Sequence, residues 1–272
     1  MSNSNEPAVS SLIRDGVAII PNFLDTETFR AVRREYEESR TTLPYVRDWD
    51  YASLVPPEAY DDPERLKRLP IAIEHAIAFD AKHFQQTATH VVNNERLRSI
   101  VSAATRRKDI KAPDTRIVSW LRAAPGEEVP TSGTRVRPRG EYMLHADTHY
   151  PTFKAFFYLN PVSAGNGAFV YVRRSHRLSL ERLTYEYEAG VRVAQAKKDG
   201  RWSKYPYGHL RRPDADYINR LGLREESITG PENTLVIADT SGFHRRGEFT
   251  NNEPRETIFM HWRNVDASLL GL

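Results

Sequence analysis

The stretch EYMLHADTHYPTFKAFFYL, residues 141–159, contains two short runs rich in apolar and aromatic residues, separated by polar residues and a proline. Such runs are typical of short β-strands, here Glu141–His145 and Phe153–Leu159. Similar runs between turn residues lie at 116–122, 168–172, 234–238 and 257–262. Several short strands joined by turns predict a mainly β sandwich or barrel in the second half of the chain.

The first half of the chain has a different pattern. A short helix ending near Gly16 is followed by the apolar run Val17–Ile20, which predicts a strand. Asp25 is suited to accept hydrogen bonds from the first-turn amides of a second helix. Apolar positions from Ile71 to about Ala104 predict further helices packed outside the sheet. Residues 41–69, rich in Pro, Asp and Tyr, have no clear period and predict an irregular excursion.

Composition limits the class of protein. The chain has 272 residues, 39% of them hydrophobic, which suits one large domain. Cysteine is absent, so disulfides and thiolate metal sites are excluded. No apolar run approaches the roughly 20 residues that a membrane span needs, and no secretion signal is recognisable, so we expect a cytoplasmic protein. Basic residues are scattered and the net charge is only +3, so we do not expect nucleic acid as a partner.

His145 and Asp147 are two residues apart in the first quoted run. On an extended strand such residues point to the same side, so an imidazole and a carboxylate can face one metal ion. A lone His-x-Asp pair is weak support, because such pairs are common as surface hydrogen-bonding groups. A second segment, Gly230–Gly247, runs from a turn through an apolar strand to His244, which lies 99 residues (244 − 145) after His145. Two histidines and one carboxylate would complete one face of a metal centre and leave the other face open.

Arg255 follows His244 by 11 residues (255 − 244), where a turn at Pro254 leads into another apolar run. A guanidinium close to the metal can hold a carboxylate through paired hydrogen bonds. Arg255 is therefore a candidate anchor for the carboxylate of a ligand that binds beside the metal.

Taken in order, these segments resemble the phytanoyl-CoA dioxygenase family of iron and 2-oxoglutarate oxygenases. The likeness covers the opening Arg14 to Leu24, the block from His145 through Tyr158-Leu159-Asn160 to Ser175-His176-Arg177, and the distal block Gly230 to Arg255. It implies a double-stranded β-helix, or jelly roll, in one domain over residues 1–272. The helical flank would cover about 1–110 and the jelly-roll core about 116–272, with an insertion at about 179–230 that we expect to act as a lid or wall of the site.

The resemblance assigns His145, Asp147 and His244 to Fe(II) and Arg255 to 2-oxoglutarate. Family members often carry a hydroxyl residue two positions after the distal histidine, where this chain has Arg246. We therefore expect Thr257 or Tyr158 to supply the second contact to 2-oxoglutarate, and Arg246 to face the substrate. His149, just past the metal strand, is a further candidate to line the substrate pocket, although a solvated loop histidine is an equal alternative.

The implied reaction consumes 2-oxoglutarate and O2, releases succinate and CO2, and hydroxylates a C–H bond of a small molecule, with ascorbate as reductant in vitro. Because Asp147 is a carboxylate, halogenation is disfavoured, whereas desaturation, cyclisation and epimerisation remain open. A cupin-like metal enzyme without 2-oxoglutarate would give Arg255 no role. A ligand-binding module without turnover is the alternative from another class. The sequence names neither the substrate nor the oligomeric state.

Overall fold

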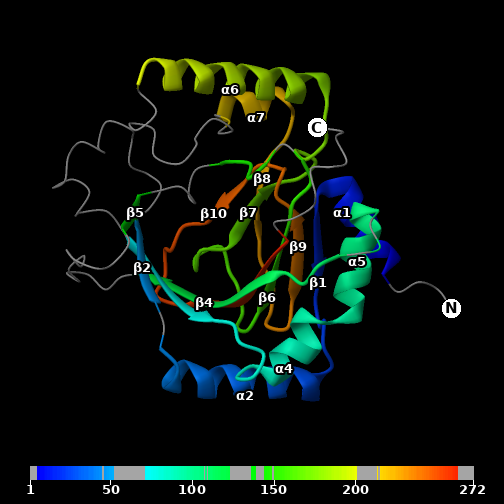
Figure 1. Ribbon diagram of the computed structural model, residues 1–272, viewed down its shortest axis with the longest axis vertical. Coiled ribbons are helices and arrows are strands. Elements are labelled where there is room, and N and C mark those ends of the chain that lie inside the picture. The colour runs from blue at the N-terminus through cyan, green and yellow to red at the C-terminus, as the bar shows by residue number, and fades with distance from the viewer. Residues whose placement is uncertain are drawn as a thin grey trace.

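The computed structural model describes residues 5–44, 46–51, 71–106, 108, 110–122, 136–138, 144–148, 150–200, 213 and 215–262. Within these ranges, a large and a small β-sheet face each other, and helices cover the outer face of the large sheet (Figure 1). The predicted mainly β architecture with flanking helices is confirmed.

Eight strands form the large sheet, in the order β1-β9-β6-β11-β4-β3-β2-β5. Their bounds are β1 Val17–Ile20, β2 Val46–Tyr51, β3 Ile71–Ala78, β4 Asp114–Arg122, β5 Val136–Pro138, β6 Phe153–Tyr158, β9 Leu235–Asp239 and β11 Arg255–Trp262. Only β2 and β5 are parallel; the other described neighbours are antiparallel. The small sheet has the order β10-β7-β8, with bounds β7 Phe169–Val172, β8 Glu225–Ile228 and β10 His244–Arg246.

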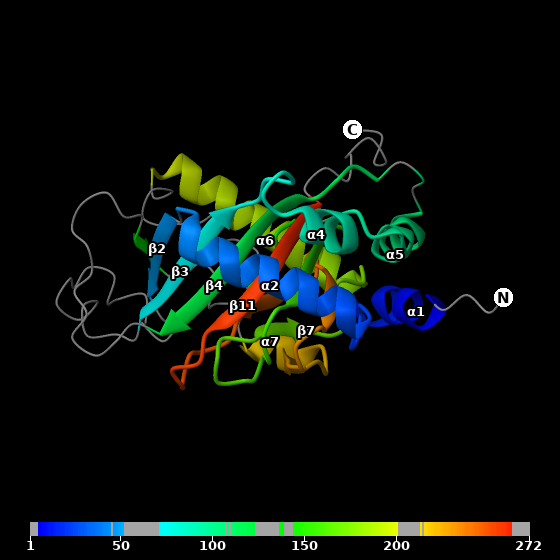
Figure 2. The ribbon, with the colours of Figure 1, turned by 90° about the horizontal axis from the view of Figure 1, so that it is seen from below.

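The helices lie mainly around the large sheet. Their bounds are α1 Glu6–Asp15, α2 Thr26–Thr42, α4 Gln85–Thr87, the π-helix η2 Ala88–Val92, α5 Glu95–Thr105, α6 Leu180–Lys198 and α7 Ala215–Arg220. Helix α2 crosses the outer face of the large sheet (Figure 2). It begins as predicted, because the Asp25 side chain accepts from the main-chain N–H groups of Glu27 and Thr28. None of the described helices has the length and apolar character needed to cross a membrane.

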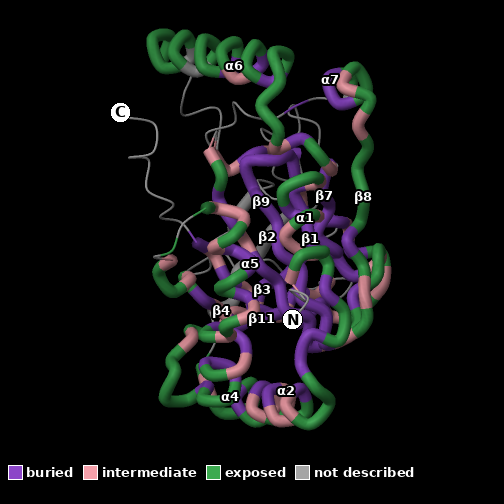
Figure 3. The backbone as a smooth tube through the Cα atoms, turned by 90° about the vertical axis from the view of Figure 1, so that its right-hand side faces the viewer, coloured by how far each residue is buried: buried purple, intermediate pink, exposed green. Residues whose placement is uncertain are grey.

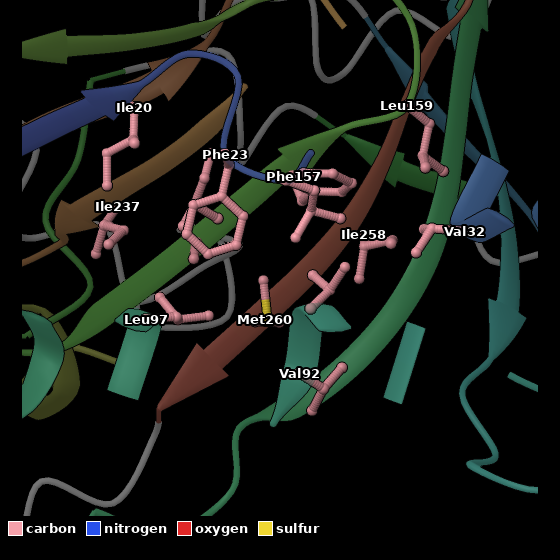
Figure 4. Close-up of a cluster of buried hydrophobic side chains, with 14 of the residues drawn as sticks. Ile20, Phe23, Val32, Val92, Leu97, Phe157, Leu159, Ile237, Ile258 and Met260 are labelled. Atoms are coloured by element: carbon pink, nitrogen blue, oxygen red, sulfur yellow. The ribbon is translucent and has the colours of Figure 1, made fainter. Parts of the chain in front are cut away.

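Alternation along the strands divides the interior into two layers. In β6, Phe153, Ala155 and Phe157 pack toward the helices, whereas Phe156 and Tyr158 pack toward the small sheet. Figure 4 shows Phe157 beside Phe23, Ile258 and Met260 in the helix-side layer. The strands are therefore mostly buried on both faces, whereas α6 lies outermost and is largely exposed (Figure 3).

The prediction of helices from Ile71 was wrong for residues 71–78, which form β3. Ile73 and Ile77 are four residues apart, a spacing that fits one face of a helix and also one face of a strand. Pairing with β2 and β4, which are distant in sequence, decides between the two. The region predicted as a helical flank, about 1–110, contributes β1, β2 and β3 to the large sheet, and of these only β1 was predicted.

Two other predictions need correction. Residues 46–51, placed in an irregular excursion, form the strand β2, while residues 52–70 lie outside the described ranges. The predicted strand Glu141–His145 is reduced, in its described part, to an isolated bridge at His145. The insertion predicted at about 179–230 supplies α6, α7 and the strand β8 of the small sheet, and its residues 201–212 and 214 are outside the described ranges.

Candidate metal centre

The three residues predicted as metal ligands come together at one end of the small sheet. His145 and His244 form an antiparallel bridge, in which each main-chain N–H donates to the other residue's carbonyl oxygen at 2.9 Å. The Asp147 N–H donates to the Thr240 carbonyl oxygen, also at 2.9 Å. Asp147 Oδ1 lies 3.8 Å from His145 Nε2 and 3.6 Å from His244 Nε2. Donor atoms of the three side chains all lie within 4.8 Å of one another.

The orientation of His244 suits it to bind a metal through Nε2. Its Nδ1 lies 2.9 Å from the Gly242 carbonyl oxygen, so Nδ1 carries the proton and donates it there. Within the described ranges, the buried Nε2 has no hydrogen-bond partner. Burial lowers the pKa of His244 to about 3, so Nε2 is unprotonated at neutral pH and can bind a metal through its lone pair.

Lys154 lies beside Asp147, a contact that the sequence analysis did not predict. Its Nζ is 2.7 Å from Asp147 Oδ2. Burial acts to raise the pKa of Asp147, but the charges of Lys154, His244 and His145 outweigh burial and hold that pKa well below its usual range. A signal was present: Lys154 stands within the apolar strand FKAFFY, and a lysine buried in a strand needs an anionic partner.

The turn between β9 and β10 fixes the position of His244. At its start, the Ser241 N–H and hydroxyl donate to Asp239 Oδ1 at 3.0 and 2.7 Å. At its end, the Phe243 N–H donates to Ser175 Oγ at 2.7 Å. Between them, Gly242 packs so closely on the Tyr171 side chain that an added Cβ would overlap the hydroxyl.

Arg182 of α6 supports the same turn from the insertion. Its guanidinium is buried, donates to the Ser241 carbonyl oxygen at 2.8 Å and lies 4.0 Å from the centroid of the Phe243 ring. Glu186, one helical turn later, accepts from it at 2.7 Å. Sequence analysis missed Arg182, because its contact with the metal-site turn is made at Ser241, which lies 59 residues away in the chain. The insertion therefore contacts the metal centre through the turn that carries His244.

A cavity of about 270 Å³ opens beside the metal centre. Alternate residues of the large sheet form much of its wall, since one face of each strand points inward. From the large sheet these are Glu74, Arg116, Val118, Trp120, Lys154, Phe156, Arg255, Thr257, Phe259 and His261. From the metal centre and the small sheet, Asp147, His244, Arg246 and Phe169 complete most of the remaining wall. The cavity thus combines two of the candidate ligands, Asp147 and His244, with several cationic and aromatic side chains.

The residues predicted to contact 2-oxoglutarate have different positions. Arg255 and Thr257 lie two apart on β11 and both line the cavity. The Arg255 guanidinium also donates to the Gly167 carbonyl oxygen. Tyr158 is not a lining residue: its hydroxyl donates to the Ile228 carbonyl oxygen at 2.7 Å, in the layer between the sheets. A contact of Tyr158 with 2-oxoglutarate therefore stays a prediction, whereas Thr257 is the one of the two that lines the cavity.

Arg246 and His149 were predicted to face the substrate, and only Arg246 lies within the described residues. Arg246 lines the cavity, where its guanidinium stacks 3.4 Å from the centroid of the Trp120 ring. At the position where family members often carry a hydroxyl side chain, this chain thus has an arginine that stacks on an aromatic ring in the cavity wall. His149 lies outside the described residues.

Comparison with known proteins identifies the family and the fold. The family profile of phytanoyl-CoA dioxygenase (PhyH) matches residues 12–206. The match includes His145 and Asp147 but ends before His244 and Arg255, so the distal half of the site is known from the fold. No curated protein sequence matches the chain.

Several solved structures share the fold. The epimerase SnoN, crystallised with Fe3+, alpha ketoglutarate and nogalamycin RO, is 14% identical with a TM-score of 0.58, covering 98% of this chain and 89% of SnoN. The non-heme alpha ketoglutarate dependent carbocyclase SnoK from nogalamycin biosynthesis is 16% identical with a TM-score of 0.56, covering 99% and 91%. AviO1 from Streptomyces viridochromogenes Tue57 is 15% identical with a TM-score of 0.53, covering 98% of each chain. At these identities the similarity establishes the jelly-roll fold.

Proposed function

The chain belongs to the phytanoyl-CoA dioxygenase family, and from that premise we propose that it is an iron(II)- and 2-oxoglutarate-dependent oxygenase that hydroxylates a C–H bond of a small molecule. One observation supports this proposal above the others. Two imidazole nitrogens and one carboxylate oxygen lie within 4.8 Å of one another, and the cavity lined by Asp147 and His244 is also lined by the buried Arg255. Two histidines and one carboxylate with open positions are the ligand set of non-haem iron(II) oxygenases.

The residues fit a divalent iron ion. His145 Nε2, Asp147 Oδ1 and His244 Nε2 would hold it, and the hydrogen bond at Nδ1 of His244 presents Nε2 to the metal. The buried Nε2 without a hydrogen-bond partner among the described residues is the group that such an ion would satisfy. When bound, iron and 2-oxoglutarate supply a C–H oxidant from O2, with release of succinate and CO2.

Arg255 and Thr257 would bind the distal carboxylate of 2-oxoglutarate. A buried guanidinium holds a carboxylate through charge-assisted hydrogen bonds, and a neighbouring hydroxyl on the same strand face adds a donor. The wall made by Arg246 and Trp120 would then face the substrate. Epimerisation or ring closure at the same centre is the second candidate, favoured by the fold shared with SnoN and SnoK. We also propose that residues 1–272 act as one domain, in the cytoplasm.

The test measures succinate formed from 2-oxoglutarate with iron(II), ascorbate and O2, without substrate. We expect the wild type to turn over slowly and Arg255→Ala to lose most of that rate through a higher KM for 2-oxoglutarate. Arg173→Ala is the matched control, because Arg173 pairs with Glu226 away from the cavity. Equal rates in the wild type and Arg255→Ala, with both folded, would refute the assignment of Arg255, and no succinate from the wild type would refute that of 2-oxoglutarate. Incorporation of one oxygen atom from labelled O2 into a substrate would separate hydroxylation from epimerisation.

A further inference from the structure

The two carboxylate oxygens of Asp147 face different partners. Oδ1 is the oxygen 3.8 and 3.6 Å from the two histidine Nε2 atoms. Oδ2 is the oxygen 2.7 Å from Lys154 Nζ. A carboxylate can bind a metal through one oxygen or through both. In this structure the second oxygen already has a cationic partner.

Lys154 is held where it can contact only this end of the cavity. It lies on β6, between Ala238 of β9 and His261 of β11 in the sheet register, and its side chain is only 12% exposed. The strand is paired on both sides, which fixes the Lys154 backbone, and the ammonium group is paired with Asp147 Oδ2. A buried ammonium needs such a partner, since burial without one is strongly unfavourable.

The charges around the centre also favour an anionic ligand. Asp147 is the carboxylate among the three candidate ligands, while Lys154 and Arg255 add two positive charges to the same cavity. A divalent ion bound here would leave an excess of positive charge. A dianion such as 2-oxoglutarate would neutralise much of that excess.

We propose that Lys154 is a positioning residue that restricts Asp147 to a single metal-binding oxygen and makes metal binding depend on 2-oxoglutarate. By holding Oδ2, Lys154 keeps a coordination position open for the chelating cosubstrate. By its charge, it weakens binding of the metal alone and strengthens binding of the metal together with the dianion. This inference rests on the proposed function.

The test compares metal binding with and without 2-oxoglutarate, and needs no turnover. Co2+ is titrated anaerobically into wild type and Lys154→Met, with binding followed by calorimetry and by the visible spectrum of Co2+. We expect Lys154→Met to bind Co2+ alone about tenfold more tightly, and the enhancement of Co2+ affinity by 2-oxoglutarate to fall by about tenfold, a change within the usual range of coupling between sites. The Co2+ spectrum without 2-oxoglutarate should also change, because Asp147 gains a second bond to the metal.

Two further variants keep the result interpretable. Lys154→Arg retains the charge and should keep wild-type coupling and spectrum. Lys82→Met removes an exposed lysine whose structural contact is through its main-chain N–H, so it should change neither quantity. Thermal unfolding of each apoprotein checks that the fold is intact.

The outcomes separate this inference from the proposed function. If Lys154→Met binds Co2+ alone as the wild type does, with the same spectrum, but binds 2-oxoglutarate weakly, then Lys154 contacts the cosubstrate directly and the inference is overturned. Weaker binding of Co2+ alone would also overturn it. If the wild type binds no Co2+ at His145, Asp147 and His244, the proposed function itself fails.

Discussion

Replacing Arg182 with Met should destabilise the protein and loosen the metal centre together. The side chain is 4% exposed and is paired with Glu186 at 2.7 Å. It also donates to two main-chain carbonyl oxygens, those of Ser175 and Ser241. Removing one partner of a buried ion pair costs about 3–5 kcal/mol, because the remaining charge stays buried without compensation. We therefore expect Arg182→Met to lower the free energy of unfolding of the apoprotein by about 3 kcal/mol or more.

Urea denaturation measures this loss, and a double-mutant cycle with Glu186→Gln identifies its source. The double variant should be more stable than the sum of the two single losses predicts, by about 1–3 kcal/mol, since Glu186→Gln removes the uncompensated charge. Co2+ affinity should fall in Arg182→Met, because the turn that carries His244 loses its contact at Ser241. A loss below about 1 kcal/mol would mean that the pair behaves as a surface ion pair. Unchanged Co2+ affinity would mean that the insertion covers the site without supporting it, and either result would refute the reasoning.

Two further substitutions test the same division between scaffold and site. Gly242→Ala should destabilise the protein by about 1–3 kcal/mol and weaken Co2+ binding, because the new methyl group would overlap the Tyr171 hydroxyl at the turn before His244. Urea denaturation measures the loss of stability, and calorimetric titration measures Co2+ affinity. A variant as stable as the wild type would contradict the close packing of Gly242 on Tyr171. Tyr36→Phe should lower the free energy of unfolding by about 1–2 kcal/mol, because it removes the 2.8 Å hydrogen bond to Glu256. Co2+ affinity should not change, because Glu256 lies on the opposite face of β11 from the cavity. Weaker Co2+ binding in this variant would show that the two faces are coupled.

The sequence was informative where local pattern and chemistry coincide. The Asp25 cap and the apolar strand leading to His244 could be predicted, because each depends on a few neighbouring residues. The three candidate ligands were found because the His145-x-Asp147 pair occurs together with a later histidine at the end of an apolar strand, in segments that follow the order seen in the family. Long-range contacts were missed: β3 was assigned to a helix, since only its pairing with β2 and β4 makes it a strand.

The same limit applies to individual side chains in the site. Thr257 and Tyr158 are paired across β11 and β6, so both point to the inner face, and the sequence could not say which one reaches the cavity. In the structure Thr257 lines the cavity, whereas the Tyr158 hydroxyl donates to the Ile228 carbonyl oxygen. Lys154 and Arg182 carried a weak signal as charged residues in otherwise apolar surroundings, but their partners could be identified only in three dimensions.

The main-chain hydrogen bonds of the three candidate ligands predict that a change in the turn between β9 and β10 affects all three together. His145 and Asp147 belong to no extended strand in the described residues. Their main-chain hydrogen bonds run instead to His244 and to Thr240, on the turn between β9 and β10 and the strand that follows it. Movement of that turn therefore carries all three candidate ligands with it. Substitutions that disturb the turn, such as Gly242→Ala and Arg182→Met, should weaken metal binding without touching any ligand, whereas an equally destabilising change on the helix side of β11 should leave metal affinity intact. Metal affinity should accordingly follow the integrity of this turn and not the overall stability of the protein.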